Sequence, residues 1–131
     1  MVNLTQIVAV VDDDESVRRA LKRLLHSAGV KAETFSSGEA FLDSLSSATS
    51  SVPLCVIADL EMPGIDGFEI QRRMVSTGMP IIFISGNDDP EVREKVLAQG
   101  AADYLSKPFN GDVLIRAVQM IIGSPKKGFN P

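Results

Sequence analysis

The stretch Ile7-Val8-Ala9-Val10-Val11-Asp12-Asp13-Asp14 decides the fold of this chain. Its first five residues form a continuous apolar run, rich in β-branched side chains. Such a run is typical of a strand that is buried on both faces, as in a parallel sheet. Three aspartates follow at once, and ligands of open parallel sheets bind at the carboxyl ends of the strands. We therefore predict a buried strand that carries acidic candidate site residues at its end.

Beyond Asp14 the apolar residues take helical spacing, and short apolar runs then alternate with amphipathic stretches along the whole chain. The predicted strands span residues 7–11, 31–35, 54–58, 81–84 and 102–105. The predicted helices follow candidate N-caps, namely Asp14, Ser36 or Ser37, Asp66, Asp89 and Asn110. Five strands and five helices in strict alternation predict an α/β fold with a parallel sheet and helices on both faces.

The composition is that of one globular domain. The chain has 131 residues, of which 44% are hydrophobic, and a net charge of −4. We assign residues 1–123 to a single domain and 124–131, with its glycine, prolines and lysines, to a linker or disordered tail. The acidic balance argues against a broad basic face for nucleic acid. Cys55 is the one cysteine, which excludes an internal disulfide and a thiolate metal site.

No feature of the sequence suggests a membrane or a secretion route. The first residues lack the basic start and apolar core of a signal peptide. No apolar run approaches 18 residues, the length that a spanning helix needs. We therefore expect a cytoplasmic protein.

Polar residues from four predicted strand ends form the candidate site. They are Asp12 and Asp13 after the first strand, Asp59 after the third, Ser85 after the fourth and Lys107 after the fifth. Neighbouring carboxylates repel by ~4 kcal/mol per pair at 4 Å near a protein surface, so they need a cation. Oxygen ligands favour a hard ion such as Mg²⁺. A carboxylate beside Mg²⁺ can attack phosphorus, while an ammonium and a hydroxyl stabilise the phosphoryl oxygens.

Each of these residues also has a plainer interpretation. Asp14 is as well placed to cap the following helix as to act in the site. The pair Lys107-Pro108 could belong to an ordinary solvated loop, and Ser85-Gly86 to any turn. Asp59 fits the capping interpretation poorly, because Pro63-Gly64 keeps a helix from starting directly after it. The joint placement of the set, rather than any single member, favours the functional interpretation.

Four motifs then give the sequence a specific resemblance over nearly its whole length. They are Val10-Val11-Asp12-Asp13, the segment 59–67 (Asp-Leu-Glu-Met-Pro-Gly-Ile-Asp-Gly), Ile84-Ser85-Gly86, and the segment 100–109 (Gly-Ala-Ala-Asp-Tyr-Leu-Ser-Lys-Pro-Phe). In these motifs the chain resembles the CheY-like receiver domain of two-component response regulators. The resemblance implies a flavodoxin-like, doubly wound sheet of order 2-1-3-4-5 and a cis Lys107–Pro108 bond.

The resemblance also implies a role for each site position. Asp59 would accept a phosphoryl group from a sensor histidine kinase, and Lys107 and Ser85 would bind that group. Mg²⁺, for which Mn²⁺ can substitute, would be held by Asp12, Asp13, Asp59 and the backbone carbonyl of Glu61. Tyr104 would be a switching aromatic that turns inward when Ser85 moves to the phosphoryl group. The alternative for Tyr104 is a half-buried ring with its hydroxyl in water.

Local features in residues 12–18 and 35–42 resemble receivers of the FixJ and NarL type, which precede a DNA-binding domain. No such domain follows here, so the chain is either a stand-alone receiver or a truncated one, and we favour truncation. DNA would then be bound only through the absent output domain, and the output would be transcription. When phosphorylated, the chain could also form a homodimer through the face of its fourth helix, fifth strand and fifth helix.

We expect a phosphorylated switch that is not a metabolic enzyme. Two other classes of protein are alternative interpretations of the sequence. One is a receiver-like interaction module that never accepts phosphate. The other is a haloacid-dehalogenase-type phosphatase, but such enzymes need an Asp where this chain has Glu61. Glu61 is also uncommon among receivers, which more often have Asn, Arg, Lys or Met there. Its negative charge suggests altered Mg²⁺ binding or an altered phosphoryl lifetime.

Overall fold

The computed structural model describes residues 7–46, 52–87 and 89–123. The chain alternates strands and helices as the sequence predicts. The strands are β1 (Ile7–Val11), β2 (Lys31–Phe35), β3 (Cys55–Asp59), β4 (Ile81–Ser85) and β5 (Asp103–Ser106). The helices are α1 (Glu15–Ser27), α2 (Gly38–Leu45), α3 (Gly67–Met74), the 3₁₀ turn η1 (Val75–Thr77), α4 (Pro90–Ala98) and α5 (Gly111–Ile122). The predicted tail, residues 124–131, lies outside the described residues.

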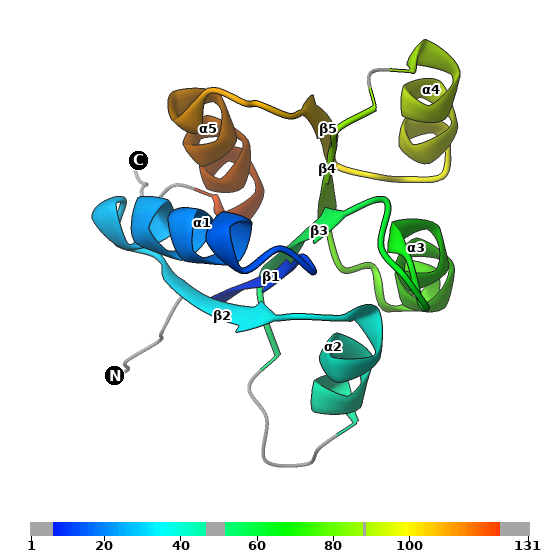
Figure 1. The fold of residues 1–131 in the computed structure, drawn as a ribbon, viewed down its shortest axis with the longest axis horizontal. Helices are drawn as coiled ribbons and strands as arrows, with labels where there is room; N and C mark the ends of the chain where they lie inside the picture. The colour runs from blue at the N-terminus through cyan, green and yellow to red at the C-terminus, as the bar shows by residue number, and fades with distance from the viewer. Residues whose placement is uncertain (1–6, 47–51, 88, 124–131) are drawn as a thin grey trace.

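All five strands pair in parallel in the order β2-β1-β3-β4-β5, which confirms the predicted topology. Helices α1 and α5 cover one face of the sheet, and α2, α3 and α4 cover the other (Figure 1). Alternate side chains of β1 therefore enter two separate cores. Val8 and Val10 pack with residues of α1 and α5, whereas Ala9 and Val11 pack in the core that α2 and α3 share.

Three strands end one residue later than the apolar runs predict. Asp59, Ser85 and Ser106 are the last residues of β3, β4 and β5. The reason is that backbone pairing continues beyond the apolar side chains, since Asp59 pairs with Ile84 and Ser85 with Ser106. Two candidate site residues therefore belong to the sheet itself rather than to the loops after it.

The predicted helix caps are present. The side chains of Asp14, Ser37, Asp66, Asp89 and Asn110 accept hydrogen bonds from backbone N–H groups of the first helical turns. Of the two candidates before α2, Ser37 is the cap. The capping interpretation of Asp14 is thus correct.

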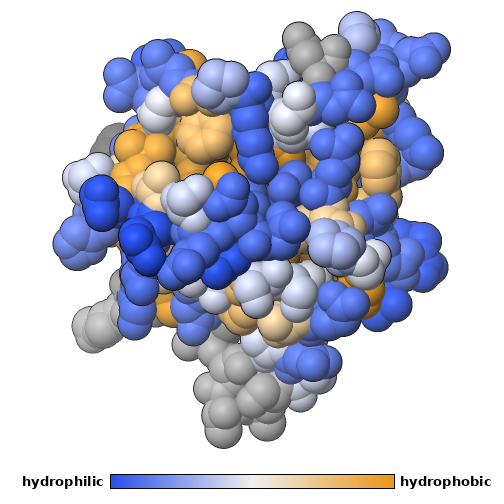
Figure 2. Space-filling view, in the orientation of Figure 1, coloured by the Kyte–Doolittle hydropathy of each residue, from blue (hydrophilic) through white to orange (hydrophobic). Residues whose placement is uncertain are grey.

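The view in Figure 2 is mostly hydrophilic, with apolar side chains visible where α1 lies beside α5. Within the residues that the structure describes, no helix has the length and hydropathy that crossing a membrane requires.

Burial of Cys55 in the middle of the sheet yields a first prediction. Desolvation raises the pKa of the Cys55 thiol to about 12, so only about 1 in 10⁴ molecules carries the thiolate at pH 8. In the native protein we expect Cys55 to resist a disulfide reagent such as DTNB and to react fully in denaturant. An added cysteine at exposed Val52 (Val52→Cys) serves as the reactive control. Prompt labelling of native wild-type protein would contradict the burial.

Candidate functional site

The candidate site lies where the carboxyl ends of β1, β3 and β4 meet the loop after β5. Val11 of β1 is paired with Ala58 of β3, so the residues that follow, Asp12 and Asp59, come from adjacent strands. Both are buried, with exposed fractions of 0% and 5%. Buried carboxylates without partners are strongly destabilising, so their surroundings decide whether the fold tolerates them.

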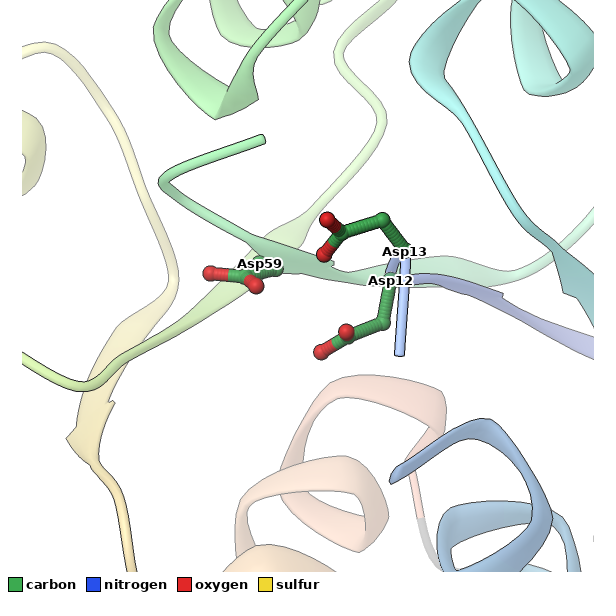
Figure 3. A group of neighbouring side chains, drawn as sticks. All are labelled: Asp12, Asp13 and Asp59. Atoms are coloured by element: carbon green, nitrogen blue, oxygen red, sulfur yellow. The ribbon is translucent and has the colours of Figure 1, made fainter. Parts of the chain in front are cut away.

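Asp13 completes a group of three carboxylates. One carboxylate oxygen from each of Asp12, Asp13 and Asp59 lies within 4.8 Å of the others. Figure 3 shows the side chains of Asp12 and Asp13 leaving the end of β1 and extending toward Asp59. Asp13 is exposed, which leaves one side of the group open to solvent. A set of hard oxygen donors at this spacing suits a small divalent cation such as Mg²⁺.

Lys107 supplies the positive charge next to the two buried aspartates. Its Nζ lies 3.2 Å from Oδ2 of Asp12 and 3.2 Å from Oδ2 of Asp59. Burial lowers the pKa of Lys107, but the charges of Asp12 and Asp59 outweigh this effect and raise its pKa overall. The Lys107 N–H donates to the carbonyl of Ser85 at 2.7 Å. The Lys107–Pro108 peptide bond is cis, as the resemblance implied.

The environment of Asp59 opposes its ionisation. Burial is the main cause of its raised pKa, and the negative charge of Asp12 adds to the effect. The Glu61 N–H, 3.1 Å from Oδ1, and Lys107 partly offset this. Both carboxylate oxygens of Asp59 thus already have a hydrogen-bond donor. A further cation beside the group would favour the charged form, in which a carboxylate is nucleophilic.

The loop after Asp59 is compact and packs against the strand. Gly64 adopts a left-handed backbone with φ of +73°, as the predicted turn at Pro63-Gly64 requires. The N–H of Gly67 donates to the carbonyl of Leu60 at 2.9 Å. A Cβ atom on Gly67 would lie 2.7 Å from Cα of Leu60, so only glycine fits there. The start of α3 is therefore held directly against the residues that follow Asp59.

Ser85 lies beside this group and contacts Glu61. Its side chain is fully buried, and its Oγ is 3.3 Å from Oε1 of Glu61 and 3.3 Å from the carbonyl oxygen of Asn87. The Asn87 N–H donates to the same Oγ at 3.0 Å. The sequence identified Ser85 and the position of Glu61, but not that the Glu61 carboxylate faces the Ser85 hydroxyl.

Tyr104 is buried in this structure, with 1% of its surface exposed. Its hydroxyl donates to the Asn87 carbonyl at 2.6 Å, so the alternative of a half-buried ring with a hydrated hydroxyl is wrong. Arg93 of α4 donates to the Tyr104 carbonyl at 3.0 Å, and its guanidinium lies 5.8 Å from the ring centroid. Asn87 and Arg93 were missed by the sequence analysis. The spacing of Asn87 from Ser85 suits a local serine turn, whereas nothing in the sequence indicates Arg93.

The comparisons with known proteins agree with this geometry. The sequence profile of the response regulator receiver domain matches residues 8–119. The chain is 36% identical over 115 residues to the response regulator protein TmoT of Ectopseudomonas mendocina, covering 86% of this chain and 51% of TmoT. It is 37% identical over 121 residues to the transcriptional regulatory protein FixJ of Azorhizobium caulinodans, covering 88% of this chain and 54% of FixJ. The chain thus spans about half the length of these relatives.

A solved structure gives the same result. The crystal structure of a response regulator receiver protein from Burkholderia phymatum superposes with a TM-score of 0.83 at 51% identity. The superposition covers 91% of this chain and 96% of that one. Sequence profile, curated relatives and structure therefore agree over nearly all of the described fold. The chain belongs to the family of response regulator receiver domains.

Proposed function

We propose that this chain is a phosphorylation-activated signalling switch in which Asp59 accepts a phosphoryl group from a sensor histidine kinase. The observation that carries the proposal is the position of Lys107, with Nζ 3.2 Å from both Asp12 and Asp59. A cation held between a nucleophilic carboxylate and a second carboxylate can bind phosphoryl oxygens as they arrive. Family membership supports the same function.

Asp12, Asp13, Asp59 and the backbone carbonyl of Glu61 are the residues that we propose to hold Mg²⁺, or Mn²⁺ in its place. The spacing of the three carboxylates supports this ligand set. The bound ion would offset the negative charges of the carboxylates and the phosphoryl group, so that they can approach. The exposed side of Asp13 leaves room for water ligands.

Phosphoryl transfer then needs little covalent chemistry from the protein. A carboxylate oxygen of Asp59 forms a bond to phosphorus as the bond from phosphorus to the donor histidine nitrogen breaks, and the imidazole leaves. Lys107 donates to the phosphoryl oxygens in place of Oδ2 of Asp59, and the Ser85 hydroxyl donates to another. Water later hydrolyses the acyl phosphate and restores Asp59. The protein is thus a phosphoacceptor and not a metabolic enzyme.

The output would be read from the face that α4, β5 and α5 form. Phosphorylation would bias this face between two arrangements, and a homodimer or a target would bind one of them. The relatives named above include a transcriptional regulator, so we propose transcription as the output, through a DNA-binding domain beyond residues 1–123. We place the switch in the cytoplasm, as for response regulators in general.

The competing functions are now less well supported. Family membership argues against a haloacid-dehalogenase-type phosphatase. A receiver-like module that never accepts phosphate would have no need to gather three carboxylates and Lys107 at one edge of the sheet. Chemical phosphorylation distinguishes that module from a switch.

Treatment with acetyl phosphate and Mg²⁺ should add one phosphate to the wild-type chain, detected by intact-protein mass spectrometry. Asp59→Asn should abolish the adduct, because an amide cannot form an acyl phosphate. Asp43→Asn, at an exposed position on α2, is the matched control and should behave like wild type. An adduct that persists in Asp59→Asn, or the lack of one in wild type, would overturn the proposal.

Mg²⁺ should stabilise the folded protein. At a concentration ten times the dissociation constant, we expect about 1.4 kcal/mol of added stability, or roughly 5 °C in the thermal midpoint. Asp13→Asn should remove most of this shift, because it deletes one ligand at an exposed position without disturbing the core. The Asp43→Asn control should keep it. An identical shift in Asp13→Asn would argue against the ligand set.

The charge of Glu61 should affect either the affinity of the site for Mg²⁺ or the lifetime of the phosphoryl group on Asp59. Replacing Glu61 by Asn should weaken Mg²⁺ binding by about fivefold, since it removes a negative charge near the ion, or change the rate of dephosphorylation. Mg²⁺ titration and the decay of the phosphate adduct measure the two quantities. Equal values for wild type and Glu61→Asn in both measurements would reject this role.

A further inference from the structure

A run of residues joined by hydrogen bonds leads from Glu61 to helix α4. The Ser85 hydroxyl lies 3.3 Å from the Glu61 carboxylate, and the Asn87 N–H donates to Ser85 Oγ at 3.0 Å. The Tyr104 hydroxyl donates to the Asn87 carbonyl at 2.6 Å. Arg93 of α4 then donates to the Tyr104 carbonyl at 3.0 Å. The run starts next to Asp59 and ends on the face proposed to carry the output.

The proton of the Ser85 hydroxyl has two acceptors at the same distance of 3.3 Å, Glu61 Oε1 and the Asn87 carbonyl oxygen. Glu61 is the better acceptor for two reasons. Glu61 is an exposed residue, and its carboxylate carries a charge that makes it a better acceptor than a neutral carbonyl. The Asn87 oxygen also already accepts the short bond from Tyr104. With its proton directed to Glu61, Ser85 Oγ is a stronger acceptor for the Asn87 N–H.

The position of Asn87 in turn matters for Tyr104. The Tyr104 ring is buried, and a buried hydroxyl without a partner is costly. The Asn87 carbonyl is the acceptor that the structure provides for it. Fixing the backbone at Asn87 therefore stabilises the inward arrangement of Tyr104, and with it the position of the ring 5.8 Å from the Arg93 guanidinium.

We propose that Glu61 is a positioning residue that holds Tyr104 inward before any phosphoryl group is present, by accepting the hydrogen bond of the Ser85 hydroxyl. The phosphoryl group on Asp59 would compete with Glu61 for that same hydroxyl, and in this respect the inference rests on the proposed function. Because Tyr104 is already held inward, phosphorylation would change the ratio of inward to outward Tyr104 less in this chain than in a variant with an uncharged side chain at position 61.

The position of Tyr104 can be followed by its own fluorescence and NMR signals, because the chain has one tyrosine and no tryptophan. Acrylamide quenching of its fluorescence and NMR of a ¹³C-tyrosine sample both report this single ring. In untreated protein, Glu61→Ala should lower the ratio of inward to outward Tyr104 by about fivefold, the worth of a modest charge-assisted hydrogen bond. Glu61→Gln should show a smaller loss, because its amide oxygen still accepts but carries no charge.

The matched control is Glu33→Ala, which removes an exposed glutamate from β2, on the far edge of the sheet from β5. It should leave the Tyr104 signals unchanged. A Tyr104 ratio that is the same in wild type and Glu61→Ala would overturn the proposal. So would an equal change in Glu33→Ala, which would indicate a general charge effect.

A double-mutant cycle tests whether Glu61 acts through Ser85. In a Ser85→Ala background the hydroxyl is missing, so Glu61→Ala should cause no further change in Tyr104. Circular dichroism and thermal unfolding would establish that the variants are folded. If Glu61→Ala shifted Tyr104 as much without Ser85 as with it, the hydrogen-bond route would be wrong.

Phosphorylation is measured separately, so that the two proposals fail independently. The quenching and NMR experiments use untreated protein and need no phosphate on Asp59. With Mg²⁺ and beryllofluoride, Glu61→Ala should regain the inward Tyr104 ratio while wild type changes little. A failure of wild type to take up phosphate would reject the proposed function alone. If phosphate uptake were normal but the ratio of inward to outward Tyr104 were the same in wild type and Glu61→Ala, only this inference would be rejected.

Discussion

The ion pairs of Lys107 with Asp12 and Asp59 are the interaction on which the rest of the site depends. Parallel pairing of β1 with β3 brings two carboxylates to the buried ends of adjacent strands. Two such charges at 4 Å repel by ~4 kcal/mol near a protein surface. Lys107 reaches both at 3.2 Å and offsets part of that repulsion. The pKa of Asp59 stays raised, chiefly because the group is buried and to a smaller extent because of the charge of Asp12.

The apolar cores and the helix caps of the fold offset the cost of burying these carboxylates. Two apolar cores, one on each face of the sheet, and capped helices supply stability. Close packing of Gly67 on Leu60 fixes the loop after Asp59. A site that retains uncompensated negative charge has affinity for cations, and one cation would satisfy three carboxylates at once. In the proposed function, the same repulsion between carboxylates would favour binding of a metal ion and, with it, a phosphoryl group.

Signal output needs a connection from this cluster to the surface, and the structure contains a short one. Ser85 ends β4 within the site, while Asn87 and Tyr104 extend the hydrogen bonds to Arg93 on α4. These contacts are the route by which we propose that a change at Ser85 reaches α4. Glu61 gives this chain a charged acceptor at the start of that route.

The sequence by itself determined the alternation of strands and helices, the caps, and the placement of the candidate site residues at the strand ends. These features depend on local periodicity, on side chains that bond their own backbone, and on motifs read by resemblance. Only the tertiary structure decided that Asp59 and Ser85 lie within strands, that Glu61 faces Ser85, and that Tyr104 is buried with its hydroxyl on Asn87. Glu61 and Ser85 are 24 residues apart, and Asn87 and Tyr104 are 17 apart. Such contacts depend on strand register and side-chain rotamers, which no local pattern specifies.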